Sequence, residues 1–175
     1  MTASVVRAAP LDRRDLFRLL RAGIFTGISD GLFASVLTVG FFHGTFIRLW
    51  QSVASVLLGA DAFDGGNRTV LIGLVLHFCV AFTWSTVLFA LVERWAWLRG
   101  VLRSPGGVLK VAAVYGPGIW LVMALVVIPL LVHRAPAFTI RWLVQWIGHA
   151  PFVGYPMTAA IAGGLTRAPP DPAGG

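Results

Sequence analysis

Charged residues are scarce in this chain, and their scarcity excludes an ordinary soluble protein. Asp, Glu, Lys and Arg make up 12% of the 175 residues, whereas 57% are hydrophobic. A typical soluble domain carries about twice as much charge. Charge at this level cannot cover the surface of a soluble protein of this size, and the length is sufficient for one sizeable domain only.

Cysteine and catalytic motifs are equally scarce. Cys79 is the only cysteine, which excludes an internal disulfide and a cysteine-ligated metal cluster. No Ser, His and acid share a recognisable hydrolase motif. We therefore expect a protein that is not an enzyme and that holds no metal, since an outer-face pair such as His43 and His133 gives too few ligands for a typical site.

Long hydrophobic runs, by contrast, dominate the chain. Residues 22–47 contain one charged residue, Asp30, and residues 69–92, 111–133 and 142–166 contain none. A helix needs roughly 20 apolar residues to cross a bilayer core of about 30 Å, and its backbone must satisfy its own hydrogen bonds there. The pattern predicts an all-α integral membrane four-helix bundle, with spans near 20–43, 69–93, 109–133 and 146–166.

Two shorter segments have the composition of helices that lie in the membrane interface. Residues 45–60 carry Arg48, Gln51 and two serines mostly on one side, and residues 139–145 resemble them, with Ile-Arg followed by Gln in both. An apolar face in the acyl boundary is typical of such helices. We expect one or two short interfacial helices on the outer side, and the likeness is either a weak internal duplication or coincidence.

The positive charges predict the orientation. One side of a four-span protein holds the N-terminal tail (1–19), the connection between the second and third spans, and the C-terminal tail (167–175). Together with the residues that flank them, these segments contain ten Lys or Arg, whereas the other side contains four. The positive-inside rule then places both termini in the cytoplasm of a bacterial inner membrane. The formal net charge of +7 is accordingly a lipid-attracted flank and not a nucleic-acid footprint. The Pro- and Gly-rich tail 167–175 is expected to be disordered.

Small residues recur at four-residue spacing in the first span, at Gly23, Gly27, Gly31 and Ser35. Small residues let helix backbones approach closely, and packing drives association where no hydrophobic effect operates. The stripe predicts a tight helix crossing inside one bundle or, alternatively, at a homo-oligomer interface. The lipid bilayer itself is the one partner that the composition requires.

Four polar residues at membrane depth are candidates for a buried site: Asp30, His77, Tyr115 and His149. Asp30 lies about ten residues, roughly 15 Å, from the inner boundary, and His77 lies at a comparable depth from the outer one. An ionised carboxylate there is costly, so Asp30 should face protein or water, where it could meet His77.

Several interpretations of these residues stay open. In one interpretation the four residues only pack as hydrogen-bonded polar groups. In another they form a proton-responsive site, since histidine ionises near pH 6.5. A haem between His77 and His149 is a further alternative, although their depths differ and no cofactor is required by the sequence. Passage of a proton or small solute through an oligomeric transporter completes the set.

The combination resembles a set of uncharacterised four-helix bacterial inner-membrane proteins that includes the YagU-like family. The resemblance spans roughly 20–166 and depends on short motifs, namely Gly27 with Asp30, the segments 52–59 and 62–66, Gly73 to Phe78, Tyr115-Gly116, and His149 before Gly154. It implies a cytoplasmic-membrane location and, for YagU-like members, a role in acid resistance. It brings no catalytic residue.

We therefore expect a small polytopic inner-membrane protein that supports envelope or acid-stress homeostasis. The alternative is an accessory subunit, with or without haem, of a larger membrane redox complex.

Overall fold

Every regular element in the described part of the chain is a helix, as the sequence predicted. A computed structural model describes residues 12–133 and 135–165. Three helical stretches, Arg13–Phe41, Gly66–Arg94 and Gly107–Val132, are long and apolar enough to cross a membrane by length and composition. They correspond to the first three expected spans. The expected disordered tail 167–175 lies outside the described residues.

The described chain forms α-helices and shorter π or 3-10 segments. Their order is α1 (Arg13–Val36), η1 (Leu37–Phe41), α2 (Phe46–Leu58), η2 (Gly59–Phe63), α3 (Gly66–Arg94), α4 (Ala96–Arg103), α5 (Gly107–Val122), η3 (Met123–Val127), α6 (Ile128–Val132), α7 (Ile140–His149), η4 (Ala150–Gly154) and α8 (Tyr155–Ala162). The π-helical segments η1, η3 and η4 continue the preceding α-helices without a break.

Side-chain caps determine where three of these helices begin. Asp12 caps α1 in a reciprocal capping box with Asp15, and Thr45 and Thr139 accept backbone N–H bonds at the starts of α2 and α7. The first helix consequently begins at Arg13, inside the segment 1–19 that the sequence predicted as a tail. The absence of charge marks the apolar part of a helix, whereas the N-terminal cap marks the residue at which the helix begins.

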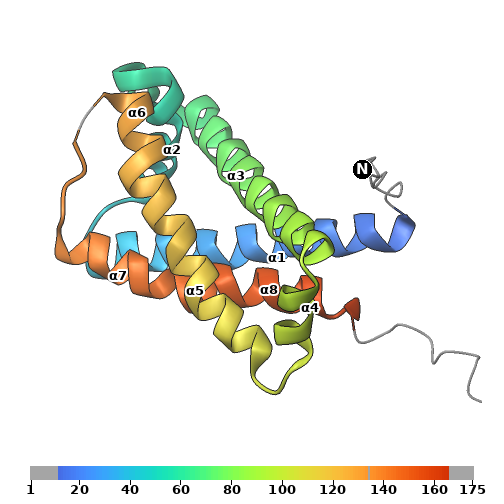
Figure 1. Cartoon of the computed structure of the whole chain (residues 1–175). Helices are drawn as coiled ribbons and strands as arrows, with labels where there is room; N and C mark the ends of the chain where they lie inside the picture. The colour runs from blue at the N-terminus through green and yellow to red at the C-terminus, as the bar shows by residue number, and fades with distance from the viewer. Residues whose placement is uncertain (1–11, 134, 166–175) are drawn as a thin grey trace, which may run out of the picture.

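The last helical stretch differs most from the expectation. It runs without interruption from Ile140 through α7, η4 and α8 to Ala162, so residues 139–145 are its beginning and not a separate interfacial segment. In Figure 1 it lies alongside α1 and runs in the opposite direction, while α5 crosses in front of it. This stretch packs between α1 and α5 and carries Arg141, Gln145 and His149 in its first half.

Helix α2 packs along α3 and not apart from the bundle. Its buried residues include Trp50, Gln51 and Ala54. Gly73 of α3 makes this approach possible, because a Cβ there would lie only 2.0 Å from the carbonyl oxygen of Trp50. Only glycine permits backbones to come this close.

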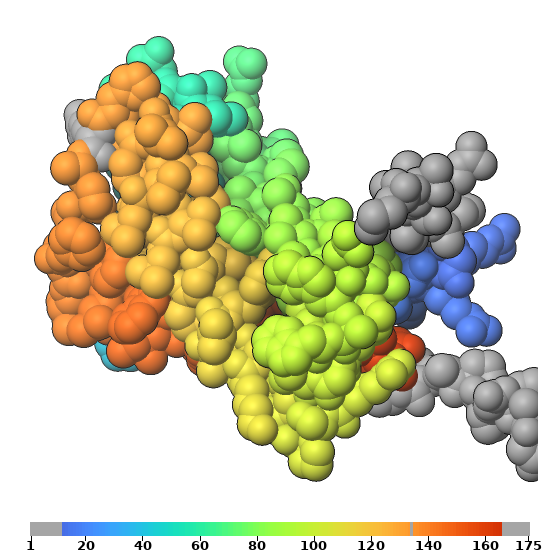
Figure 2. Space-filling model, viewed as in Figure 1, coloured from blue at the N-terminus to red at the C-terminus, as the bar shows by residue number. Residues whose placement is uncertain are grey.

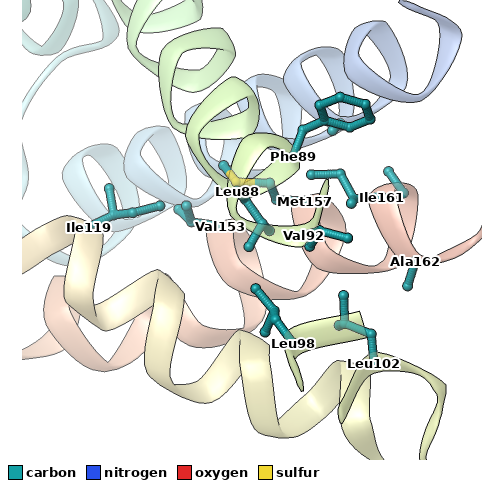
Figure 3. Close-up of a cluster of buried hydrophobic side chains, with 12 residues drawn as sticks. Leu88, Phe89, Val92, Leu98, Leu102, Ile119, Val153, Met157, Ile161 and Ala162 are labelled. Carbon is teal, nitrogen blue, oxygen red and sulfur yellow. The ribbon is translucent and has the colours of Figure 1, made fainter. Parts of the chain in front are cut away.

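The buried core gathers at the junction of α3, α4, α5 and α8. Figure 3 shows Leu88 and Val92 of α3 together with Leu98 of α4 and Met157 of α8. Helix α4, which the sequence did not predict, contributes Leu98 and Leu102 to this core. The core therefore holds α3 and α5 against α8 at one end of the bundle.

Much of the outer surface of the described bundle is apolar. Large hydrophobic side chains on all three long stretches are well exposed, among them Leu32, Leu71, Val114 and Leu130. Figure 2 shows the side chains of α5 and α6 covering one face beside the ends of α3 and α4. A soluble monomer rarely exposes apolar area on this scale.

Candidate functional site

A cavity of about 440 Å³ lies between α1, α2, α3, α5 and the last helical stretch. Its walls are mostly apolar and include the aromatic rings of Phe33, Trp50, Trp84 and Trp120. Three of the four predicted polar residues, Asp30, His77 and His149, line it. The volume falls within the range of small-molecule sites, which are apolar with a few convergent polar groups.

Asp30 of α1 and His77 of α3 meet at this cavity. The imidazole Nδ1 lies 3.9 Å from a carboxylate oxygen of Asp30. Both side chains are largely buried: that of His77 is 14% exposed and that of Asp30 is 20% exposed. The other ring nitrogen, Nε2, lies 2.9 Å from the backbone carbonyl oxygen of Gly27. A carbonyl only accepts hydrogen bonds, so Nε2 carries a proton and donates it.

This assignment limits the proton states of the pair. With Nε2 protonated, the neutral imidazole presents the lone pair of Nδ1 toward Asp30. At 3.9 Å the two groups lie close enough to interact electrostatically but too far apart for a direct hydrogen bond.

The glycine stripe of α1 makes the pair possible. Gly23, Gly27 and Gly31 receive the aromatic rings of Phe82, Phe78 and Trp50 respectively, where any added Cβ would collide or press tightly. Ser35 continues the stripe and donates to the carbonyl of Gly31. The stripe thus accommodates aromatic side chains of α3 and α2, and the missing side chains let His77 reach the backbone of α1.

Backbone-to-backbone crossings occur elsewhere, between α5 and η4. A Cβ on Gly116 would lie 2.1 Å from the carbonyl oxygen of His149, and a Cβ on Gly154 would lie 2.2 Å from that of Ala112. The two glycines face each other's helices at one crossing point. This crossing holds the backbone of His149 against α5.

His149, on the last helical stretch, lines the cavity together with the Asp30–His77 pair. Its Nδ1 donates to the carbonyl oxygen of Gln145 at 2.7 Å, and its ring lies 4.8 Å from the ring of Trp120. Within the described residues Nε2 has no hydrogen-bond partner. His149 thus lines the same cavity as Asp30 and His77.

Tyr115, the fourth predicted residue, has a different place. Its hydroxyl donates to the backbone carbonyl of Trp84 at 2.8 Å, and the two rings meet edge to face. It ties α5 to α3 and does not line the cavity. Its role in the structure is to position a wall residue.

Two cavity residues escaped the sequence analysis. Arg141, which donates to the hydroxyl of Thr38 at 2.7 Å, and Gln145 line the cavity together with His149. The three stand at four-residue spacing on α7 and therefore share one face. That spacing was visible in the sequence, but a predicted boundary between residues 145 and 146 divided the stripe.

The histidines at the ends of spans are placed apart from the cavity. His43 and His133 adopt positive φ angles of 52° and 53° at the ends of η1 and α6. In residues 12–133 and 135–165, no three His, Cys, Asp or Glu side chains are grouped so that they could hold a metal ion.

Comparison of the chain with protein-family models, with curated proteins and with solved structures found no match. Over residues 12–133 and 135–165 the fold defines an all-helical protein with three helices of membrane-spanning length and composition.

Proposed function

We propose that this chain is a four-span protein of the bacterial inner membrane in which Ile140–Ala162 is the fourth span. The stretch exceeds the roughly 20 residues that a span needs. Its polar residues Arg141, Gln145 and His149 face the cavity, so they do not prevent insertion. The excess of Lys and Arg on one side supports cytoplasmic termini.

The proposed function is a proton-responsive role in envelope or acid-stress homeostasis. The YagU-like resemblance implies a role in acid resistance but no mechanism for it. One observation carries it: a carboxyl and an imidazole from different helices approach within 3.9 Å at an apolar cavity. Such pairs inside membranes are rare and commonly functional.

Acidification would change the charge of this pair. In this proposal protonation of the pair adds positive charge to a cavity that Arg141 also lines, and Arg141 opposes that charge. A net charge in an apolar cavity must be hydrated or removed, which weakens the packing of α1 against α3.

The test replaces both groups and measures acid tolerance. Cells that carry D30L/H77L should survive acid challenge less well, and their cytoplasmic pH should fall further, than cells with the unchanged protein. The matched control is D61L/H43N, which alters one acid and one histidine away from the cavity. Equal membrane levels of both variants, measured by immunoblot, exclude a folding defect as the cause. Survival of D30L/H77L equal to that of the unchanged protein would refute the proposal.

A haem-bearing accessory subunit receives less support from the geometry. His77 already uses Nε2 on Gly27 and faces Asp30 with Nδ1, so it would have to surrender a hydrogen bond to ligate iron. A visible spectrum of protein purified in mild detergent distinguishes the two: a Soret band that His149→Leu abolishes would favour haem. Co-purifying subunits would favour the accessory role.

A further inference from the structure

We infer that the cavity binds one acyl chain of an anionic phospholipid whose phosphate pairs with Arg141. This inference rests on the membrane placement proposed above and not on the acid-stress role. It follows from the charge of Arg141, from the apolar walls, and from the opening of the cavity toward lipid.

Arg141 is the only Lys or Arg among the described residues that line the cavity. Its guanidinium has five N–H groups and stays charged in proteins. One N–H donates to the hydroxyl of Thr38, and the guanidinium carbon lies 5.4 Å from the centre of the Phe42 ring. No carboxylate within residues 12–133 and 135–165 forms an ion pair with it. Arg141 therefore keeps its charge and most of its donors for a group from outside the described chain.

Asp30 does not supply the missing anion. It lies eight residues before Thr38, roughly 12 Å along the helix at 1.5 Å per residue, and its carboxylate faces His77 at 3.9 Å. A guanidinium bound to Thr38 is therefore beyond its reach. The neutral side chains of Gln145 and Thr26 also line the cavity, but both can donate and accept, so they do not select the ligand. The charge of Arg141 does.

A lipid phosphate matches Arg141 in chemistry and in depth. The planar guanidinium binds phosphate through two parallel N–H···O bonds, and such charge-assisted bonds are about twice as strong as neutral ones. Arg141 stands in the first turn of α7, at one end of the proposed fourth span. Residues at the end of a span lie at the level of the lipid headgroups. A phosphate at this level needs no transfer into the apolar interior to reach it.

The rest of the cavity suits an acyl chain. Its walls are mostly apolar, and its lining includes Leu57 of α2 and Leu131 of α6, which are 60% and 50% exposed. These two helices contact each other, and both side chains lie on the apolar outer surface. An empty space of about 440 Å³ forfeits the van der Waals contacts of its lining. In a bilayer the molecules that can restore those contacts from the side are lipid chains.

The experiment compares two lipids with the same chains and different headgroup charge. Purified full-length protein in mild detergent is titrated with palmitoyl-oleoyl phosphatidylglycerol, which is anionic, or with palmitoyl-oleoyl phosphatidylcholine, which carries no net charge. Native mass spectrometry counts the lipids bound to each molecule. We expect the anionic lipid to bind about 10-fold more tightly at one site, the effect of one charge-assisted hydrogen bond. Soluble glycerol phosphate at equal concentration should not displace it, because it has no chain.

Variants separate the phosphate from the chain. Arg141→Met should bind both lipids equally, whereas Arg141→Lys, which keeps the charge but not the fork, should retain part of the preference. The matched control is Arg48→Met, because Arg48 also lies over a phenylalanine ring, that of Phe63, at 5.3 Å, but does not line the cavity. It should keep the full preference. Ala34→Phe places a ring in the cavity lining and should weaken the binding of both lipids.

Circular dichroism shows whether each variant is folded. The inference is overturned if the unchanged protein binds both lipids equally, if folded Arg141→Met keeps the preference, or if glycerol phosphate displaces the anionic lipid. Each of these results leaves the acid-survival comparison of D30L/H77L unaffected. Recovery of the protein from cells without detergent would instead refute the membrane placement, and this inference with it.

Discussion

The crossing of α5 over η4 allows a controlled test, because two glycines of one helix have opposite surroundings. A Cβ on Gly116 would lie 2.1 Å from the carbonyl oxygen of His149 and 2.9 Å from the nitrogen of Gly154. A Cβ on Gly118, two residues further along α5, would meet nothing within 4 Å. The substitutions G116A and G118A therefore add the same methyl group to a closed and to an open position.

The expected magnitudes follow from these distances. An ordinary contact of at least 3.4 Å requires α5 and η4 to separate by more than 1 Å at Gly116, and overpacking of this kind costs about 1–3 kcal/mol. Alanine also gains about 1 kcal/mol of helix propensity over glycine at either position. Because that gain is common to both variants, the difference between them isolates the clash, at about 1–3 kcal/mol in favour of G118A.

Thermal unfolding in nanodiscs, followed by near-UV circular dichroism, measures this difference. By the scaling for proteins of this size it amounts to about 2–12 °C in Tm, with G116A below and G118A at or above the unchanged protein. G154A should resemble G116A, and the double variant G116A/G154A should lose less than the sum, since one separation relieves both contacts. Equal Tm values for G116A and G118A would refute the close backbone crossing.

Two further variants test the contacts that hold the long helices together. Tyr115→Phe removes the hydroxyl bond from α5 to α3 and should lower the free energy of unfolding by about 1 kcal/mol, whereas Tyr155→Phe, at a side chain 48% exposed, should not change it; equal Tm values for the two would contradict the bond. Arg18→Met removes the guanidinium that donates to the last turn of α8 and pairs with acids of α1 and α3. It should lower the free energy of unfolding by roughly 1–2 kcal/mol, less than the loss of a fully buried bond, because one of the acids is half exposed. Arg13→Met, at an exposed side chain, is its control in the same unfolding assay.

The sequence predicted the helices better than their ends. The predicted second span 69–93 and the helix Gly66–Arg94 differ by a few residues, because an uncharged run and a membrane-length helix have the same physical cause. The first helix was predicted to start several residues too late, since its start depends on the Asp12 cap and not on hydropathy. The short helix α4 was missed because its eight residues are too few to show a clear hydrophobic repeat. They also lie within a charged connection.

The candidate site was foreseen in part. The sequence placed Asp30 and His77 at comparable depths, where they could meet, and in the structure the two side chains approach to 3.9 Å. The expected mismatch in depth between His77 and His149 did not keep them from lining one cavity. Tilt and crossing of the helices shift residues relative to one another, and a residue count along each span contains no information on tilt.

The sequence by itself determined that the chain is helical, that its surface is apolar, and that few polar groups lie within its long apolar helices. These properties follow from composition and spacing, which act residue by residue along one helix. Only the tertiary structure decided that Gly27 offers its carbonyl to His77, that Gly116 faces His149, and that a cavity remains between them. Such contacts depend on how distant helices rotate and cross, because each is a fit between two surfaces and not a property of either one.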